Sequence, residues 1–129
     1  MSLAAVGIIS ANPLKSVEFY QLLGVDLKKY GEHEHYEAVT SSGLRMMLDS
    51  EKLMKLLEPS WSKQNGNGVV LCFEQSSPEN VNKLYQKFVT AGFHGIKPPW
   101  DAFWGQRYAC VADPDGNQID LFAAMTPIG

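Results

Sequence analysis

The sequence predicts an α+β fold of two βαβββ modules, with curved mixed sheets forming a cup and the helices on the outer face. The order strand, helix, strand, strand, strand occurs twice in 129 residues. Each helix follows an Asn-Pro or Ser-Pro pair and ends at a glycine. This is a duplication of pattern with little residue identity. Because one helix covers one face of each sheet, the other face is free to curve around a pocket.

The same pattern predicts the domain organisation. We expect a single domain, 1–129, built from module 1 (5–50), a linker (51–68) and module 2 (69–124). A chain of this length buries roughly 65–70 % of its surface. The linker, "EKLMKLLEPSWSKQNGNG", offers a short helical turn, a proline and a Gly/Asn-rich tail that is typical of a flexible turn.

In module 1 the apolar run 5–10 has the length of a strand. Asn12 is a suitable N-cap for a helix that starts at Pro13, whose fixed φ suits the first helical position. Gly24 ends this helix. Three further strands are expected at about 25–30, 35–40 and 44–49.

Module 2 repeats this order, starting with a strand at 69–74. Ser76 or Ser77 caps the next helix, and Glu79 is available for a capping box. Gly92 ends the helix, and strands follow at 93–97, about 106–112 and 118–123. The helix carries an apolar stripe at the spacing of a core-packed helix: Val81, Leu84, Tyr85, Phe88 and Val89.

Composition excludes several classes of protein. Hydrophobic residues make up 45 % and charged residues 19 %, and the net charge is −3 with no basic cluster, which argues against nucleic-acid binding. No apolar run approaches a membrane span, and "LAAVGIIS" has the character of a first strand, not a signal peptide, so we expect a cytoplasmic protein. Cys72 and Cys110 lack CxxC spacing and are expected to be buried thiols.

Local motifs for catalysis are absent from the sequence. There is no Ser-His-Asp or Cys-His arrangement and no phosphate-binding glycine loop, so no catalytic residue is predicted. His33 and His35 form "HEH", and with Glu34 or Glu37 they could bind zinc. We favour a polar turn and a solvated strand start instead. His94 follows a helix end, where a histidine interacts favourably with the helix dipole.

The duplicated order, the helix exit "SVEFYQLLGVDL" and the motif "DPDGNQIDLF" resemble the vicinal oxygen chelate superfamily. This superfamily includes glyoxalase I, bleomycin-resistance proteins, fosfomycin-resistance enzymes and extradiol dioxygenases. The resemblance covers about residues 5–124. Its motifs are specific for the fold and poor for function, which depends on sites grafted onto the fold.

The resemblance also implies where a metal would bind. In metal-dependent members, His, Glu or Gln ligands come from the first and last strands of each module. Those positions fall on Ala5, Met47, Val69 and Asp120 in this sequence. A lone carboxylate does not hold a hard divalent ion against water. We therefore expect no metal and no cofactor.

Aromatic side chains predict a ligand-binding role. Four large rings fall within residues 100–108, and Trp61 stands in the linker. Rings in loops line small-molecule pockets, or else they plug a sheet edge or a dimer interface. Strand alternation adds residues expected to point into the cup. The predicted ligand-binding residues are Arg45, Met47, Trp61, Trp100, Phe103, Trp104, Tyr108, Asp120 and Phe122.

Asp120 has two interpretations. It is a counter-charge for a cationic ligand, or it forms an ion pair with Arg45. Taken with the resemblance, the first interpretation predicts a metal-independent binding protein of bleomycin-resistance type that sequesters an aromatic or cationic molecule without transforming it. We expect it to act as a homodimer, because modules of this family pair within one chain or across two. The alternatives are a metal-dependent lyase, isomerase or dioxygenase with an atypical metal set, and a module whose own side chains fill the cup.

Overall fold

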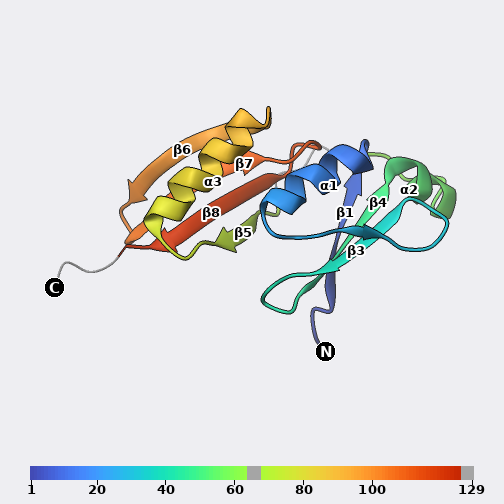
Figure 1. Cartoon of the computed structure of the whole chain (residues 1–129). Helices are drawn as coiled ribbons and strands as arrows, with labels where there is room; N and C mark the ends of the chain where they lie inside the picture. The colour runs from blue at the N-terminus through green and yellow to red at the C-terminus, as the bar shows by residue number, and fades with distance from the viewer. Residues whose placement is uncertain (64–67, 126–129) are drawn as a thin grey trace. The chain divides into compact units, whose positions relative to one another are not determined.

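The computed structural model describes residues 1–63 and 68–125 (Figure 1). The first half contains β1 (Ala5–Ser10), α1 (Pro13–Leu22), β2 (Lys28–Lys29), β3 (His35–Val39), β4 (Arg45–Ser50) and α2 (Glu51–Leu57). The second half contains β5 (Leu71–Glu74), α3 (Pro78–Thr90), β6 (His94–Ala102), β7 (Gln106–Ala112) and β8 (Gln118–Ala124).

The two halves repeat one sheet topology. The first sheet has the strand order β1-β4-β3-β2 and the second has β5-β8-β7-β6. In each sheet the first and last strands of the half pair in parallel, and the other neighbours are antiparallel. This repeat confirms the predicted α+β fold with βαβββ modules. The chain divides into two compact units, Met1–Asn65 and Gly66–Gly129.

The long helices begin and end at the predicted residues. The Asn12 side chain accepts a hydrogen bond from the amide of Lys15, and Pro13 opens α1. Ser77 caps α3 in the same way, so Glu79 is at the second helical position and not at the third, where a capping box needs it. Gly24 and Gly92 follow the two helices with φ of 79° and 90°. None of the described helices is long and apolar enough to cross a membrane.

Some element boundaries differ from the prediction. β2 has two residues, and β6 extends to Ala102, well beyond the predicted end at residue 97. β6 contains Pro98 and Pro99, and it is a sheet edge with two register shifts, where missing amide donors are tolerated. The predicted linker contains α2 up to Leu57; its residues 64–67 lie outside the described residues.

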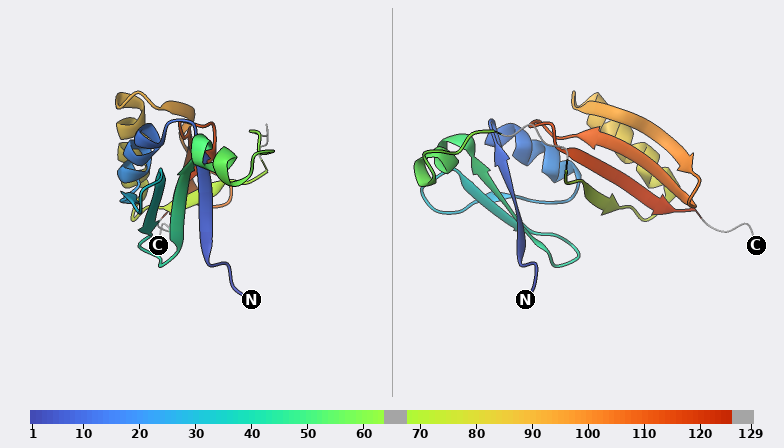
Figure 2. Two further views of the ribbon diagram at one scale, coloured as in Figure 1. Left: turned by 90° about the vertical axis from the view of Figure 1, so that its right-hand side faces the viewer. Right: turned by 180° about the vertical axis from the view of Figure 1, so that it is seen from behind.

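Strand alternation divides each sheet into a helix-packed face and an open face. Met46 and Leu48 of β4 are buried, as are Ile119 and Leu121 of β8. The view from behind in Figure 2 shows the face of the second sheet that α3 does not cover. The open face of the first sheet carries Gly7, Ile9, His35, Glu37, Arg45, Met47 and Asp49. The open face of the second sheet carries Cys72, Trp100, Gln106, Tyr108, Cys110, Gln118, Asp120 and Phe122.

A polar contact joins α1 to its sheet. Ser10 of β1 and Ser16 of α1 are both fully buried, and their hydroxyl oxygens lie 2.7 Å apart. Ser16 occupies a helix position that faces the sheet, between the buried Pro13 and Phe19. A buried hydroxyl requires a partner, and the two serines provide one for each other.

The motif "DPDGN" forms the turn between β7 and β8. Asp113 is 4 % exposed, and one carboxylate oxygen accepts the amides of Asp115 and Asn117, each at 2.9 Å. The other oxygen accepts the side-chain amide of Asn117 at 2.8 Å. Gly116 has a φ of 87°, which favours glycine. The motif therefore has a structural role: it sets the register of the strand that carries Asp120.

The stability of the second unit should depend on Phe88. This ring is fully buried, whereas the adjacent Val89 is 40 % exposed. We expect Phe88→Ala to lower the free energy of unfolding by about 3–5 kcal/mol, because it removes apolar contacts and leaves a cavity. Val89→Ala, the matched control, should change it by less than about 1 kcal/mol. Urea unfolding followed by circular dichroism measures both, and equal effects would contradict the assigned helix orientation.

Candidate functional site

Five aromatic rings form a contiguous group on the second unit, which we call the aromatic cluster: Trp100, Phe103, Trp104, Tyr108 and Phe122. Tyr108 is at its centre. Its ring centroid lies 5.4 Å from those of Trp100 and Trp104, both edge-on, and 6.1 Å from the stacked ring of Phe122. Phe103 contacts Trp104 at 5.0 Å. The four rings that sequence analysis selected as a group, and Phe122, which it selected from strand alternation, therefore lie together.

The prediction that these rings lie in loops is partly wrong. Trp100 is on β6, Tyr108 is on β7 and Phe122 is on β8. The antiparallel pairing sets Phe122 beside Tyr108 and Tyr108 beside Trp100. Side chains at paired positions point to the same face, so three adjacent strands present a row of rings. Phe103 and Trp104 are in the turn that follows β6, and Phe103 is 97 % exposed.

Asp120 lies next to this row and is 7 % exposed. One carboxylate oxygen accepts a hydrogen bond from the Tyr108 hydroxyl at 2.5 Å, and the other accepts the Gln118 amide at 2.9 Å. Both donors come from the second unit and are uncharged. Burial and the hydrogen bond to Asp120 raise the pKa of Tyr108, which keeps its hydroxyl protonated as a donor. Asp120 is therefore a carboxylate whose charge has neutral partners.

Two thiols flank Asp120. Strand pairing places Cys72 of β5 on one side and Cys110 of β7 on the other. The Cys72 sulfur lies 3.9 Å from the Tyr108 hydroxyl, and Cys72 is exposed. This corrects the expectation that both cysteines are buried. Cys110 is buried, and burial together with its hydrogen bond to Asp120 raises its pKa to about 12.

A cation lies on the aromatic cluster. The Lys97 ammonium sits 3.9 Å from the centre of the Trp100 ring. Lys97 pairs with Cys110 across the β6–β7 ladder. An ammonium over an indole is attracted by the negative face of the ring.

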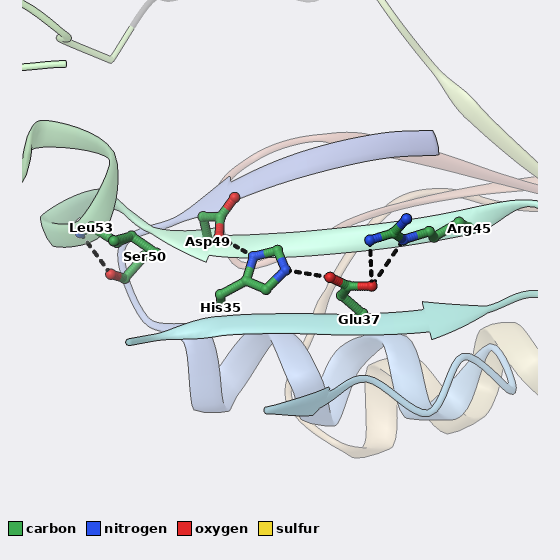
Figure 3. Close-up of polar contacts among 6 residues, drawn as sticks. All are labelled: His35, Glu37, Arg45, Asp49, Ser50 and Leu53. Carbon is green, nitrogen blue, oxygen red and sulfur yellow. Dashed lines mark hydrogen bonds and ion pairs between the residues drawn. The ribbon is translucent and has the colours of Figure 1, made fainter. Parts of the chain in front are cut away.

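The first unit has a different open face, occupied by a chain of charged side chains (Figure 3). His35 Nδ1 lies 2.5 Å from an Asp49 carboxylate oxygen, and His35 Nε2 lies 2.6 Å from an oxygen of Glu37. The second oxygen of Glu37 accepts Arg45 Nε at 2.8 Å and contacts Nη2 at 2.7 Å. We call these four residues the charged cluster. Sequence analysis considered His35 and Glu37 as zinc ligands and did not foresee this arrangement.

The pKa values within the charged cluster shift together. The hydrogen bond to Glu37, and then that to Asp49, raises the pKa of His35 in spite of its partial burial. Arg45 first, and His35 second, lower the pKa of Glu37. Glu37 raises the pKa of Arg45 in turn. Each shift favours the charged form of its group.

The remaining predicted ligand-binding residues belong to the first unit. Arg45 and Met47 are on the open face of β4, and Trp61 follows α2, with its amide bonded to the carbonyl of Glu58 at 2.8 Å. Within the first unit Arg45 pairs with Glu37, and within the second Asp120 binds Tyr108 and Gln118. Gln118, Cys72 and Lys97 were missed, although Gln118 precedes Asp120 at the same-face spacing of two.

The strand pairing shows what lies opposite two of the expected metal positions. Met47 pairs with Gly7, and Asp120 pairs with Cys72, while the assignment of Ala5, Met47, Val69 and Asp120 as metal positions stays a prediction. These pairs offer a thioether in the first unit and a thiol and a carboxylate in the second. That donor set does not fit a hard divalent ion. Among the described residues, no three His, Cys, Asp or Glu side chains gather in a way that could hold a metal ion.

A surface hollow of about 430 Å³ lies elsewhere on the first unit. Leu53 and Leu56 of α2 form its apolar part. Its other lining residues are Glu32, His33, Glu34, Ser50, Lys52 and Lys55. Solvated charges of both signs surround it, and none of the predicted ligand-binding residues lines it.

The two cysteines should differ in reactivity. With a pKa of about 12, Cys110 is a thiolate in only about one molecule in ten thousand at pH 8, and it is buried. We expect iodoacetamide at pH 8 to label Cys72 and to leave Cys110 unmodified in the folded protein. Mass spectrometry of tryptic peptides measures this, with urea-unfolded protein as the control in which both react. Labelling of Cys110 at the rate of Cys72 would contradict its described environment.

Comparison with known proteins agrees with the fold. The sequence profile of the Glyoxalase/Bleomycin resistance protein/Dioxygenase superfamily matches residues 2–121. No curated protein matches the chain. The chain is similar to the structure of a glyoxalase/bleomycin resistance protein/dioxygenase family enzyme from Burkholderia phytofirmans PsJN. The TM-score is 0.84 and the identity 20 %, over 97 % of this chain and 100 % of that one.

Two further structures share the fold. A glyoxalase-related enzyme from Fulvimarina pelagi has a TM-score of 0.82 and 18 % identity, over 100 % of this chain and 93 % of that one. TioX from Micromonospora sp. ML1 has a TM-score of 0.66 and 19 % identity, over 97 % of this chain and 100 % of that one. At such identities the likeness is one of fold. The profile match extends over nearly the whole chain, and this protein belongs to the glyoxalase/bleomycin resistance protein/dioxygenase superfamily.

Proposed function

We propose that this protein binds a planar, cationic aromatic molecule on the open face of its second sheet and sequesters it without transforming it, as a bleomycin-resistance-like member of the superfamily. The observation that carries the proposal is the aromatic cluster beside a buried carboxylate. Rings on three adjacent strands and in the next turn offer apolar area that loses little conformational entropy on binding. Asp120 supplies the negative charge that selects a cation.

The contacts of Lys97 support a cationic ligand. Its ammonium already rests on the Trp100 ring at 3.9 Å, so this surface attracts a positive charge. A flat cation that stacks on the exposed rings gains the same attraction and adds apolar contact. Within the described part of the second unit, the hydrogen-bond donors to Asp120 are neutral, in contrast to the Glu37–Arg45 pair of the first unit.

The proposal also includes further ligand-binding residues, a homodimer and a cytoplasmic location. Arg45 and Met47, selected by strand alternation, and Trp61, selected as an aromatic residue of the linker, stay in the proposed ligand-binding set. We propose a homodimer, because modules of this superfamily pair within or across chains, and a cytoplasmic location, which suits two free cysteines. A role in resistance to an antibiotic follows if the sequestered molecule is toxic.

Metal independence is tested first. We expect elemental analysis of untagged protein to find no stoichiometric metal. We also expect titration calorimetry with Ni²⁺, Zn²⁺, Mn²⁺ and Fe²⁺ to show no tight site, because the thioether, thiol and single carboxylate make a poor donor set. One tightly bound ion per chain would overturn this part of the proposal and favour a metal-dependent lyase, isomerase or dioxygenase.

Ligand binding is tested with a planar cationic dye, acridine orange, followed by quenching of tryptophan fluorescence. We expect Asp120→Asn to weaken binding about tenfold, the equivalent of about 1.4 kcal/mol, by removing the counter-charge. Asp101→Asn is the matched control. It removes an exposed carboxylate of β6 that pairs with Arg107, whose guanidinium also contacts Asn82 of α3. Binding should then be unchanged.

Sequestration without transformation is tested by mass spectrometry. Dye recovered after prolonged incubation should be chemically unaltered.

The binding measurements can also contradict the proposal. If Asp120→Asn and Asp101→Asn bind alike, the counter-charge role of Asp120 is refuted. Equal affinity for a neutral dye of the same shape would refute selection for cations.

A further inference from the structure

The geometry of the charged cluster determines how many protons its imidazole carries. A neutral imidazole has one N–H donor and one lone pair, whereas an ionised carboxylate only accepts hydrogen bonds. Both ring nitrogens of His35 lie at hydrogen-bond distance from a carboxylate oxygen, 2.5 Å to Asp49 and 2.6 Å to Glu37. Two acceptors require two donors. The arrangement in Figure 3 is therefore that of an imidazolium bridging β3 and β4.

The bridge is asymmetric. Glu37 has a second cationic partner, since Arg45 contacts its other oxygen at 2.7 and 2.8 Å. Within the described residues, no second cation contacts Asp49. When the ring loses a proton, Glu37 retains the contact with Arg45, whereas Asp49 keeps a donor only if the remaining proton stays on Nδ1. The proton that leaves is therefore the one on Nε2.

The other charged groups around His35 do not change this order. Lys28 of β2 pairs with Glu37 across the ladder, and its ammonium contacts Asp26 at 3.2 Å. The carbonyl of His35 accepts the amide of Tyr30, and its amide binds the carbonyl of His33. β1, on the far side of β4, carries no charged residue. The titratable and charged groups on the surrounding segments are Asp26, Lys28, Lys29, Tyr30, Glu32, His33, Glu34, Glu37, Arg45, Asp49, Glu51 and Lys52.

We propose that protonation of His35 switches the hydrogen bonding on the open face of the first sheet between two states, and we call this switch the latch. Closed, its imidazolium ties Glu37 of β3 to Asp49 of β4. In the open state the ring is neutral, and its remaining proton is on Nδ1, which donates it to Asp49. Nε2 then has a lone pair and no longer forms a hydrogen bond with Glu37. A carboxylate that orients an imidazole through Nδ1 leaves Nε2 suited to accept a proton. The latch is argued from contacts within the first unit and does not rest on the proposed function, although Arg45 belongs to the proposed ligand-binding set as well.

The direction of the pH dependence follows from the contacts. The pKa of His35 is raised above 6.5 in the folded protein, chiefly by Glu37. The stabilising effect of the bridge is thus fully present below the unfolded-state pKa and is lost as pH rises through the folded-state pKa. The latch therefore opens at a pH above the ordinary pKa of a histidine.

Long-range proton–nitrogen correlation NMR of uniformly ¹⁵N-labelled full-length protein tests the latch between pH 5 and 10. Below the pH midpoint of the His35 titration, both ring nitrogens should be protonated. The pH midpoint of the His35 titration in the folded protein should lie above that of the same residue in urea-unfolded protein. Above the midpoint the spectrum should show the Nδ1–H tautomer. The Nε2–H tautomer, or a midpoint at or below the unfolded value, overturns the proposal.

Two alanine variants separate the partners. In Asp49→Ala the remaining proton should move to Nε2, where Glu37 accepts it, so the tautomer reverses. In Glu37→Ala the tautomer should stay Nδ1–H, while the midpoint falls. The same tautomer in both variants overturns the assigned roles. The wild-type titration decides the proposal by itself if either variant loses its dispersed amide spectrum.

Discussion

The burial of one face of each four-stranded sheet under a helix is the constraint on which the rest of the structure depends. Side chains alternate along a strand, so the burial of Met46 and Leu48 sends Met47 and Asp49 to the open face of the first sheet. Ile119 and Leu121 do the same for Asp120 and Phe122 in the second. A slip of one residue would bury the carboxylates under the helices, so the apolar pattern specifies the register of both polar faces.

The open faces then require partners for their polar atoms, and the two modules meet this requirement differently. The first sheet sets two cations, His35 and Arg45, against two carboxylates. The second sheet gives Asp120 a phenol and an amide as donors. Burying an ion without donors is costly, so both solutions stabilise the fold. They leave different surfaces: the first carries directly paired charges, and the second carries Asp120 with neutral donors and the Lys97 ammonium over the Trp100 ring.

This difference bears on function within the superfamily. On the two parallel strand pairs, Met47 lies opposite Gly7 in one module and Asp120 lies opposite Cys72 in the other. The side chains that gather beside them in the second module are rings suited to stacking. A duplicated scaffold thus carries two unlike open faces, in keeping with function that depends on side chains and not on topology.

The sequence by itself determined the elements and their faces. Asn12-Pro13 and Ser77-Pro78 start the helices through local hydrogen bonds and fixed φ angles, and strand alternation placed Arg45, Met47, Asp120 and Phe122 on open faces. These features depend on residues a few positions apart.

Only the tertiary structure decided which side chains meet. His35 and Asp49 are fourteen residues apart, and Tyr108 and Asp120 are twelve apart. Their contacts depend on the pairing of β3 with β4 and of β7 with β8. Sequence periodicity gives the face of a residue but not its cross-strand neighbour, because the neighbour depends on turn geometry and register. For that reason the aromatic residues could be predicted from the sequence, whereas the charged cluster could not.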